Sequence, residues 1–164
     1  MKMSLEDPVS KDIPASIVEI NEDSGIDDEL QIVLFTLDDV FFGVDVNRVQ
    51  SVIENIAITA VANSPSYIRG VIDLRGDVIP VIDLKQKFNL GTSYSNDRLK
   101  MIILVDDASI NGILVDSVLE VLKISKKMIE DNPALNASNT SYVKGIARHD
   151  ETLINLVETA NIMN

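Results

Sequence analysis

The side chains that could act as nucleophile, base or metal ligand are few and widely spaced in this sequence. His149 is the only histidine, and there is no cysteine. The lack of cysteine excludes disulfides, thiolate catalysis and cysteine-bound metals. No Gly-x-Ser-x-Gly turn presents a serine, so a nucleophilic triad would depend on His149. We expect His149 to be an exposed residue of a hairpin turn.

Glycine and aspartate gather in residues 70–83, where binding of phosphate or calcium has to be considered. Gly70 and Gly76 bracket five residues but lack the Lys-Ser/Thr pair of a phosphate-binding loop. Asp73, Asp77 and Asp83 lack the glycine and terminal glutamate of a calcium loop. We expect these aspartates at strand ends and turns, with Gly76 supplying the unusual φ of a hairpin. The sequence therefore predicts no cofactor, no metal site and no enzymatic activity.

The negative charge is concentrated near the N-terminus. The chain carries 26 acidic and 14 basic side chains, a formal net charge of −12. Residues 1–29 hold nine carboxylates and two lysines, which makes −7, whereas residues 30–164 carry −5. This charge would repel a phosphate backbone, which argues against nucleic-acid binding. We expect residues 1–29 to form a flexible acidic tail and residues 30–164 to form the folded domain.

A segment that folds only on a partner is the alternative for this tail. Ile13, followed by Ile17 and Ile20, indicates a short amphipathic piece. The flanking acidic clusters and Gly25 disfavour a stable element in isolation.

The sequence predicts a cytoplasmic protein that does not insert into a membrane. Residues 1–10 contain no apolar stretch that could serve as a signal sequence. Apolar runs such as residues 101–105 are short, whereas a membrane helix needs roughly 20 apolar residues.

From Leu30 onward the pattern is typical of strands, because β-branched residues dominate short runs separated by polar turns. Pro80 is expected at a sheet edge or bulge, since it cannot donate a ladder hydrogen bond. About ten strands in this length favour closed or half-closed barrels over an open sheet. The predicted strands are residues 31–37, 40–45, 56–62, 71–74, 78–84, 101–105, 112–115, 118–124, 145–148 and 153–157, and the predicted helices are residues 83–89, 125–132 (with Ser125 as N-cap) and 158–163.

The sequence also contains an internal repeat. Residues 67–71 match residues 142–146 at an offset of 75, and the match continues without a gap from 78–83 to 153–158. A second block, residues 43–49, matches residues 112–118 at an offset of 69. The repeat predicts two similar β-subdomains, roughly 38–84 and 106–158, with a partner site in the cleft between them.

The stretch 63–84 closely resembles the central signature of CheW-type chemotaxis coupling proteins. That signature runs Pro, then Ile-Arg/Lys-Gly-Val, then Asn-Leu-Arg-Gly, then Ile-Pro-Val-Asp-Leu. A basic Lys-Phe segment follows it, and here Lys85-Gln86-Lys87-Phe88 stands in that place. The flanking blocks Phe42-Gly43-Val44-Asp45 and Gly112-Ile113-Leu114-Val115 agree with the family as well. The resemblance covers about residues 30–163 and leaves out the acidic tail.

The resemblance implies an all-β fold of two intertwined, five-stranded SH3-like barrels with short helices. It also implies a non-enzymatic adaptor that joins the cytoplasmic tips of methyl-accepting chemoreceptors to the regulatory domain of the histidine kinase CheA. An alternative is a CheW-like coupling protein of another array, such as one that controls type IV pili. A CheV-type protein would need a C-terminal receiver domain in addition. A small-molecule binder or enzyme on a β-barrel scaffold is the alternative from a different class.

Four valines match positions that this resemblance associates with partner binding. Val46 and Val49 match positions implicated in receptor and kinase coupling. Val115 and Val118 are their counterparts in the second block and would form an opposite wall. An amphipathic helical hairpin needs an apolar groove of this kind. Each valine is equally compatible with simple core packing.

Two arginines and a glycine complete the residues that the resemblance implies. Arg69 and Gly70 match a turn at which the family contacts partners, although Gly70 also fits a plain tight-turn role. Arg75 matches an arginine that pairs with a nearby carboxylate in the family. Ser51 occupies the position of the family's glutamate, so we expect Arg75 to pair with Glu54 instead.

Overall fold

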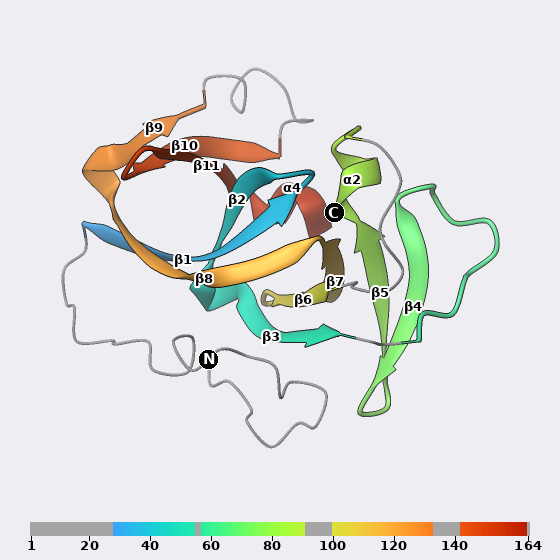
Figure 1. The fold of residues 1–164 in the computed structure, drawn as a ribbon. Coiled ribbons are helices and arrows are strands. Elements are labelled where there is room, and N and C mark those ends of the chain that lie inside the picture. The colour runs from blue at the N-terminus through green and yellow to red at the C-terminus, as the bar shows by residue number, and fades with distance from the viewer. Residues whose placement is uncertain (1–27, 55–56, 91–99, 133–141, 164) are drawn as a thin grey trace. The chain divides into compact units, whose positions relative to one another are not determined.

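The computed structural model describes residues 28–54, 57–90, 100–132 and 142–163 (Figure 1). The described chain divides into two compact units. Unit 1 contains residues 49–54, 57–90 and 100–117, and unit 2 contains residues 28–48, 118–132 and 142–163. From residue 28 onward the chain therefore builds the first part of unit 2, then unit 1, and then returns to unit 2.

Unit 1 is a five-stranded sheet in the order β3-β6-β7-β5-β4. All neighbouring pairs are antiparallel except β5 and β7, which run parallel. The strands enclose an aliphatic core that includes Ile53, Ile72, Ile79 and Ile103. The elements are β3 (Val49–Glu54), β4 (Ile68–Leu74), β5 (Asp77–Asp83), α2 (Leu84–Lys87), β6 (Lys100–Val105) and β7 (Ile110–Val115).

Unit 2 is a six-stranded sheet in the order β8-β1-β2-β11-β10-β9. Its parallel pair is β11 with β2, and its core includes Ile32, Leu34, Ile154 and Leu156. The elements are β1 (Glu29–Leu37), β2 (Val40–Asp45), η3 (Val46–Arg48), β8 (Ser117–Ser125), η4 (Lys126–Met128), β9 (Ile129–Asp131), β10 (Val143–His149), β11 (Thr152–Val157) and α4 (Thr159–Met163). The predicted all-β class with short helices is confirmed, and the three-residue β9 adds a sixth strand to this unit.

The repeat in the sequence corresponds to equivalent hairpins in the two units. In β4–β5 the register runs from Ile68 opposite Ile82 to Leu74 opposite Asp77, and in β10–β11 every pair recurs 75 residues later. Both hairpins have a register shift at the same place, before Gly70 and before Gly145. The hairpins β1–β2 and β6–β7 likewise share their register at an offset of 69.

The prediction of two contiguous subdomains at 38–84 and 106–158 was wrong. Strand β2 pairs with β11 in unit 2, and β7 pairs with β5 in unit 1. The first hairpin of each predicted subdomain therefore belongs to the other unit. Sequence similarity identified which hairpins are equivalent, but it contains no information about the parallel pairing that assigns each hairpin to a unit.

Two local predictions also need correction. Residues 57–62 of the predicted strand 56–62 form only a single bridge, between Thr59 and Val71, and Ile56 lies outside the described residues. The predicted helix 125–132 is one 3₁₀ turn followed by β9, although Ser125 is its N-cap and accepts from the Lys127 amide at 3.3 Å.

Pro80 lies in β5, which has neighbours on both sides, so the expected edge or bulge position was wrong. The opposite residue on β4 is Val71, whose N–H and C=O both bond to Thr59. This pair therefore needs no hydrogen bond from Pro80, and the parallel ladder to β7 begins only at Val81. A proline fits an inner strand here because both neighbouring ladders omit its nitrogen.

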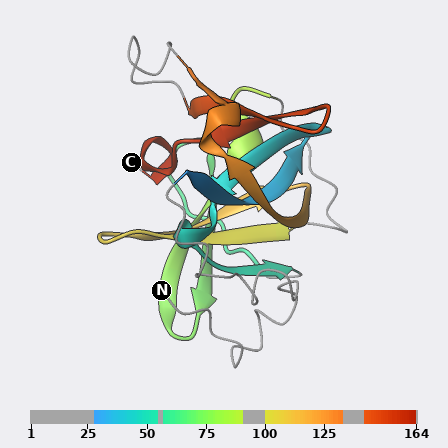
Figure 2. The same ribbon diagram turned by 90° about the vertical axis from the view of Figure 1, so that its left-hand side faces the viewer.

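A backbone contact beside Gly70 closes the outer edge of the β4–β5 hairpin. Figure 2 shows this hairpin, coloured green, from the side. Gly70 has φ +151°, and Thr59 exchanges two hydrogen bonds of 2.9 and 2.8 Å with the next residue, Val71. A Cβ at Gly70 would overlap the Thr59 carbonyl oxygen and lie 2.8 Å from its carbon. Only glycine therefore fits at this crossing.

We predict that Gly70→Ala lowers the unfolding free energy by about 3 kcal/mol, because it combines a backbone clash with a strained φ. Gly76→Ala is the matched control: its φ is +89°, but nothing lies within 4 Å of the added Cβ. That variant should lose only about 1 kcal/mol. Urea unfolding followed by far-ultraviolet circular dichroism measures both, and equal losses would contradict the role of the Thr59 contact.

Candidate functional site

The signature segment 63–84 folds into the β4–β5 hairpin and leads directly into α2. Asp83, the last residue of β5, is 2% exposed and caps the helix. Its Oδ1 accepts from the Gln86 amide at 3.2 Å, and its Oδ2 accepts from Arg69 Nη1 at 3.1 Å. One buried carboxylate thus satisfies a helix N-terminus and holds the predicted Arg69 against the hairpin.

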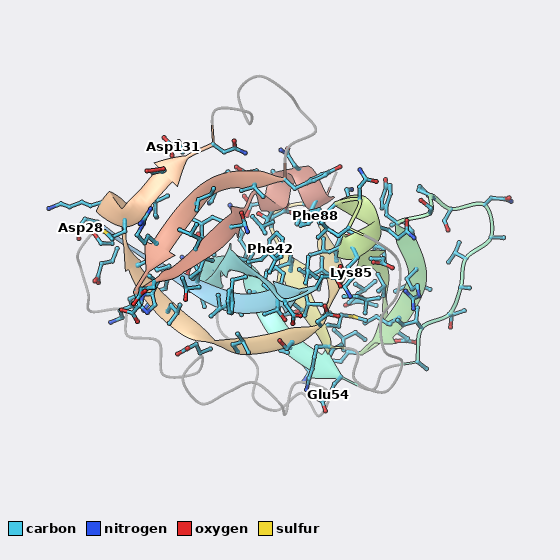
Figure 3. The ribbon with its side chains drawn as sticks, turned by 45° about the horizontal axis from the view of Figure 1, so that its top comes forward. Asp28, Phe42, Glu54, Lys85, Phe88 and Asp131 are labelled. Atoms are coloured by element: carbon cyan, nitrogen blue, oxygen red, sulfur yellow. The ribbon has the colours of Figure 1, made fainter. Side chains whose placement is uncertain are left out.

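A second ion pair anchors α2 to the end of β7. The side chain of Lys85 is only 4% exposed, and its Nζ lies 3.0 Å from Asp116 Oδ1. A buried ammonium is costly without an opposite charge, so this pair fixes the position of the helix. Lys85 lies on α2, next to Phe88 of the same segment (Figure 3).

The third contact joins α2 to the start of β4. The ammonium of Lys87 lies 4.1 Å from the centroid of the Tyr67 ring, within the range of a cation–π interaction. Burial lowers the pKa of Lys87, because desolvation disfavours its charged form. We call these three pairs the α2 cluster: Tyr67, Arg69, Asp83, Lys85, Lys87 and Asp116.

The tip of the same hairpin is exposed. The hairpin predicted around Arg75, Gly76 and Asp77 is present, but its turn contains only Arg75, with φ +56°, and Gly76, because Asp77 already pairs with Leu74. The Asp73 carboxylate accepts from the Gly76 amide at 2.9 Å and stabilises the turn. Val78, just after the turn, is 67% exposed, the highest value among the exposed large hydrophobic residues. The tip therefore presents an arginine and an apolar side chain to solvent.

The four predicted valines differ in accessibility. Val46, Val49 and Val115 are buried, whereas Val118 is half-buried. Val49 and Val115 belong to unit 1, and Val46 and Val118 belong to unit 2.

The expected partner of Arg75 makes a different contact. Glu54, at the end of β3, forms an ion pair with Lys100 of β6, the residue directly opposite it in the sheet (Figure 3). The pairing of Glu54 with Arg75 stays a prediction.

The described residues contain no group of three or more His, Asp or Glu side chains placed to bind a metal ion. His149 ends β10, and its Nε2 lies 3.7 Å from the Asp150 carboxylate. In the part of the chain that the structure describes, no helix is long and apolar enough to span a bilayer.

A family model described as the CheW-like domain matches residues 31–164. The chain belongs to the CheW-like family. It is 34% identical over 129 residues to the chemotaxis protein CheW of Thermotoga maritima, across 77% of this chain and 82% of that relative. The protein FrzA of Myxococcus xanthus is 26% identical over 137 residues, across 82% of this chain and 86% of that relative.

The fold agrees with a solved CheW structure. The crystal structure of the scaffolding protein TtCheW from Thermoanaerobacter tengcongensis matches with a TM-score of 0.72 and 35% sequence identity. The match covers 79% of this chain and 88% of that one. The resemblance to CheW-type proteins, which was drawn mainly from residues 63–84, is therefore confirmed for most of the chain.

Sequence reasoning selected Arg69 but placed it in a turn, whereas Arg69 lies in β4 of this CheW-like domain, and it missed the α2 cluster around this residue. Asp83 was expected only as a strand-end residue. The spacing Asp83-x-x-Gln86 is a capping signal that could have identified it. The Lys85–Asp116 pair had no local signal, because it joins residues 31 positions apart that only the fold brings together.

We predict that Asp83→Ala lowers the unfolding free energy by about 1–2 kcal/mol, because it removes both the cap and the partner of Arg69. Asp83→Asn keeps a cap acceptor and should lose less. Arg69→Met keeps the cap but leaves the buried Asp83 carboxylate without its counter-ion, so it should also cost about 1 kcal/mol or more. Thermal unfolding compares the three variants, and an equal loss for Asn and Ala would show that the cap contributes nothing.

Proposed function

We propose that this CheW-like protein is an adaptor that couples the cytoplasmic tips of chemoreceptors to the regulatory domain of the kinase CheA. The observation that supports this most strongly is the signature hairpin, in which Arg69 is held by Asp83 and Arg75 stands at an exposed tip. Family membership and the likeness to proteins named as chemotaxis and scaffolding proteins point in the same direction. In this proposal the protein acts by binding and is not an enzyme.

The alternative is a coupling protein of an array with another output, such as type IV pili. The relative FrzA, whose name does not include chemotaxis, keeps this alternative open. Both versions share the adaptor mechanism and differ in the receptors and the output that the array serves.

In this proposal the residues predicted to bind a partner have different roles. Arg69, Arg75 and Val118 are accessible enough to contact a partner directly. Gly70 sets the bend that aims the hairpin. The buried residues Val46, Val49 and Val115 shape the surface from beneath.

The binding chemistry expected for such a surface is apolar contact with a charged rim. An amphipathic helical hairpin presents apolar side chains at positions i, i+3, i+4 and i+7, and these need an apolar wall. Rim charges such as Arg75 set the association rate and the choice of partner more than the affinity. Because Val49 is 1% exposed, an arginine at that position would test stability rather than binding.

The test is to mix the full chain with CheA and a receptor signalling fragment from the same organism. We expect the three proteins to cosediment and the kinase activity of CheA to change when all three are present. CheA with the receptor fragment alone is the control. No complex with either partner would refute the adaptor proposal.

We predict that Arg75→Glu weakens binding to CheA or to the receptor fragment by on the order of tenfold, about 1.4 kcal/mol. The matched control is Asp150→Lys, because Asp150 occupies the equivalent turn of unit 2 with φ +53°. This control reverses a charge at the same backbone conformation and should leave binding nearly unchanged. The two variants change the net charge by the same amount in opposite directions, so a net-charge effect would differ in sign between them. Isothermal titration calorimetry measures both, and an equal loss of affinity in the two variants would show that Arg75 itself makes no specific contact.

The same binding assay also tests the proposed pairing of Arg75 with Glu54. Glu54→Arg combined with Arg75→Glu should restore binding if the two side chains interact. If the double variant is no better than either single variant, the pairing is wrong.

A further inference from the structure

Unit 2 contains an open pocket of about 680 Å³ at one end of its sheet. Leu30, Ile129 and Leu156 form its apolar part and belong to the core of this unit or pack against it. Four charged side chains also line the pocket, two basic and two acidic: Lys126, Lys144, Asp131 and Glu158. The volume lies within the range of roughly 300–1,000 Å³ that is typical of ligand pockets.

The two charged residues of the hairpin are arranged differently at the equivalent position of unit 1. At an offset of 75, Lys144 and Glu158 correspond to Arg69 and Asp83. In unit 1 these two side chains form an ion pair of 3.1 Å. In the described part of unit 2, no ion pair joins Lys144 to Glu158, and both side chains line the pocket instead.

The acidic leader, residues 1–27, joins the described chain at the rim of this pocket. The carbonyl of Asp28 accepts from the Lys126 amide at 2.7 Å, and Leu30, two residues on, lines the pocket. Figure 3 shows Asp28 and Asp131 at the same end of unit 2. The leader is therefore tethered next to an apolar site.

The leader sequence matches the chemistry of this pocket. Ile13, Ile17 and Ile20 recur at positions i, i+4 and i+7, an apolar stripe that suits an apolar floor. Residues 11–22 carry one lysine and three carboxylates (Asp12, Glu19 and Glu22), and the two lysines of the rim, Lys126 and Lys144, offer opposite charges to them.

The tether is long enough for the stripe to reach the site. Seven residues lie between Ile20 and Asp28, and the eight residue-to-residue steps between them span up to roughly 28 Å in an extended chain. A tether of this length gives an effective concentration in the millimolar range, so that even weak apolar contacts would be occupied.

We propose that residues 13–20 of the leader bind in this pocket of unit 2 in the same molecule. Ile13, Ile17 and Ile20 contact the floor formed by Leu30, Ile129 and Leu156. The leader thereby covers an apolar site that would otherwise face solvent. This intramolecular contact does not depend on the proposed adaptor function, because it needs no partner.

Paramagnetic relaxation enhancement on the full chain tests the proposal. The chain has no cysteine, so Ile17→Cys carries a single nitroxide spin label without further changes. We expect selective loss of amide signals from Leu30, Ile129 and Leu156. Adding Ile13→Asp and Ile20→Asp should restore these signals, because both substitutions place charge on the apolar stripe.

The matched control introduces the same two charges beside the stripe. Ser16→Asp with Val18→Asp should leave the signal loss in place, and recovery there would show that the contact is not made by the stripe. Selective loss at the exposed residues Met128, Ile146 and Leu153, which lie around a different pocket, would overturn the proposal. Uniform signal loss or none would also overturn it.

A mixed sample distinguishes contact within one molecule from contact between two. Spin-labelled chains without isotope enrichment are combined with enriched, unlabelled chains. The proposal requires that Leu30, Ile129 and Leu156 keep their signals in this mixture. If these signals are lost there, the pocket binds the leader of a second copy and the intramolecular proposal is wrong.

Discussion

Both units depend on the same constraint, a backbone crossing that only glycine permits. In unit 1, a Cβ at Gly70 would overlap the carbonyl of Thr59, and in unit 2 a Cβ at Gly145 would lie 2.8 Å from the carbonyl oxygen of Glu130. Each carbonyl belongs to a segment that pairs with the residue after the glycine, Val71 or Ile146. The crossing segment forms hydrogen bonds with backbone groups at the strand edge that would otherwise be unpaired. It also lets a small sheet curve. A side chain at either glycine would push this covering segment away.

The α2 cluster follows from the position of that crossing. The register shift at Gly70 falls between Ile68 and Gly70, so Arg69 lies at the irregular point of the β4–β5 ladder. Its guanidinium can then reach Asp83, which ends the partner strand and begins α2. The signature segment 63–84 therefore contains β4, the register shift before Gly70 and the N-cap Asp83. These features are linked by the contact between Arg69 and Asp83, and not only by their closeness in the sequence.

The sequence was informative where structure is determined locally. Hairpins such as Arg75–Gly76 between β4 and β5 have turn residues and alternating strands, and these identified both the turn and its positive φ. Strand β3 was missed, because four of its six residues are buried without regular alternation. The assignment of β2 and β7 to opposite units was also missed, since parallel pairing is a long-range property. For the site, Arg69 and Arg75 could be selected from the family signature, whereas the buried ion pair of Lys85 with Asp116 required the fold.

The two units share the same hairpin register, but different interactions hold the helix that follows each second hairpin strand, α2 in unit 1 and α4 in unit 2. Lys85 and Lys87 of α2 correspond, at an offset of 75, to Ala160 and Ile162 of α4. In unit 1 a buried ammonium with its carboxylate holds the helix, and such a pair requires a precise geometry because an unpaired charge there is costly. In unit 2 the counterpart of the buried Lys85 is the exposed Ala160, so this position holds no buried charge. Helix α4 instead buries Ile162, the counterpart of Lys87, in apolar packing, which tolerates small shifts. The two hairpins thus share one register, whereas the residues that follow each second hairpin strand differ. That difference alone lets unit 1 hold its helix through a charge pair of defined geometry and unit 2 hold its helix through apolar packing.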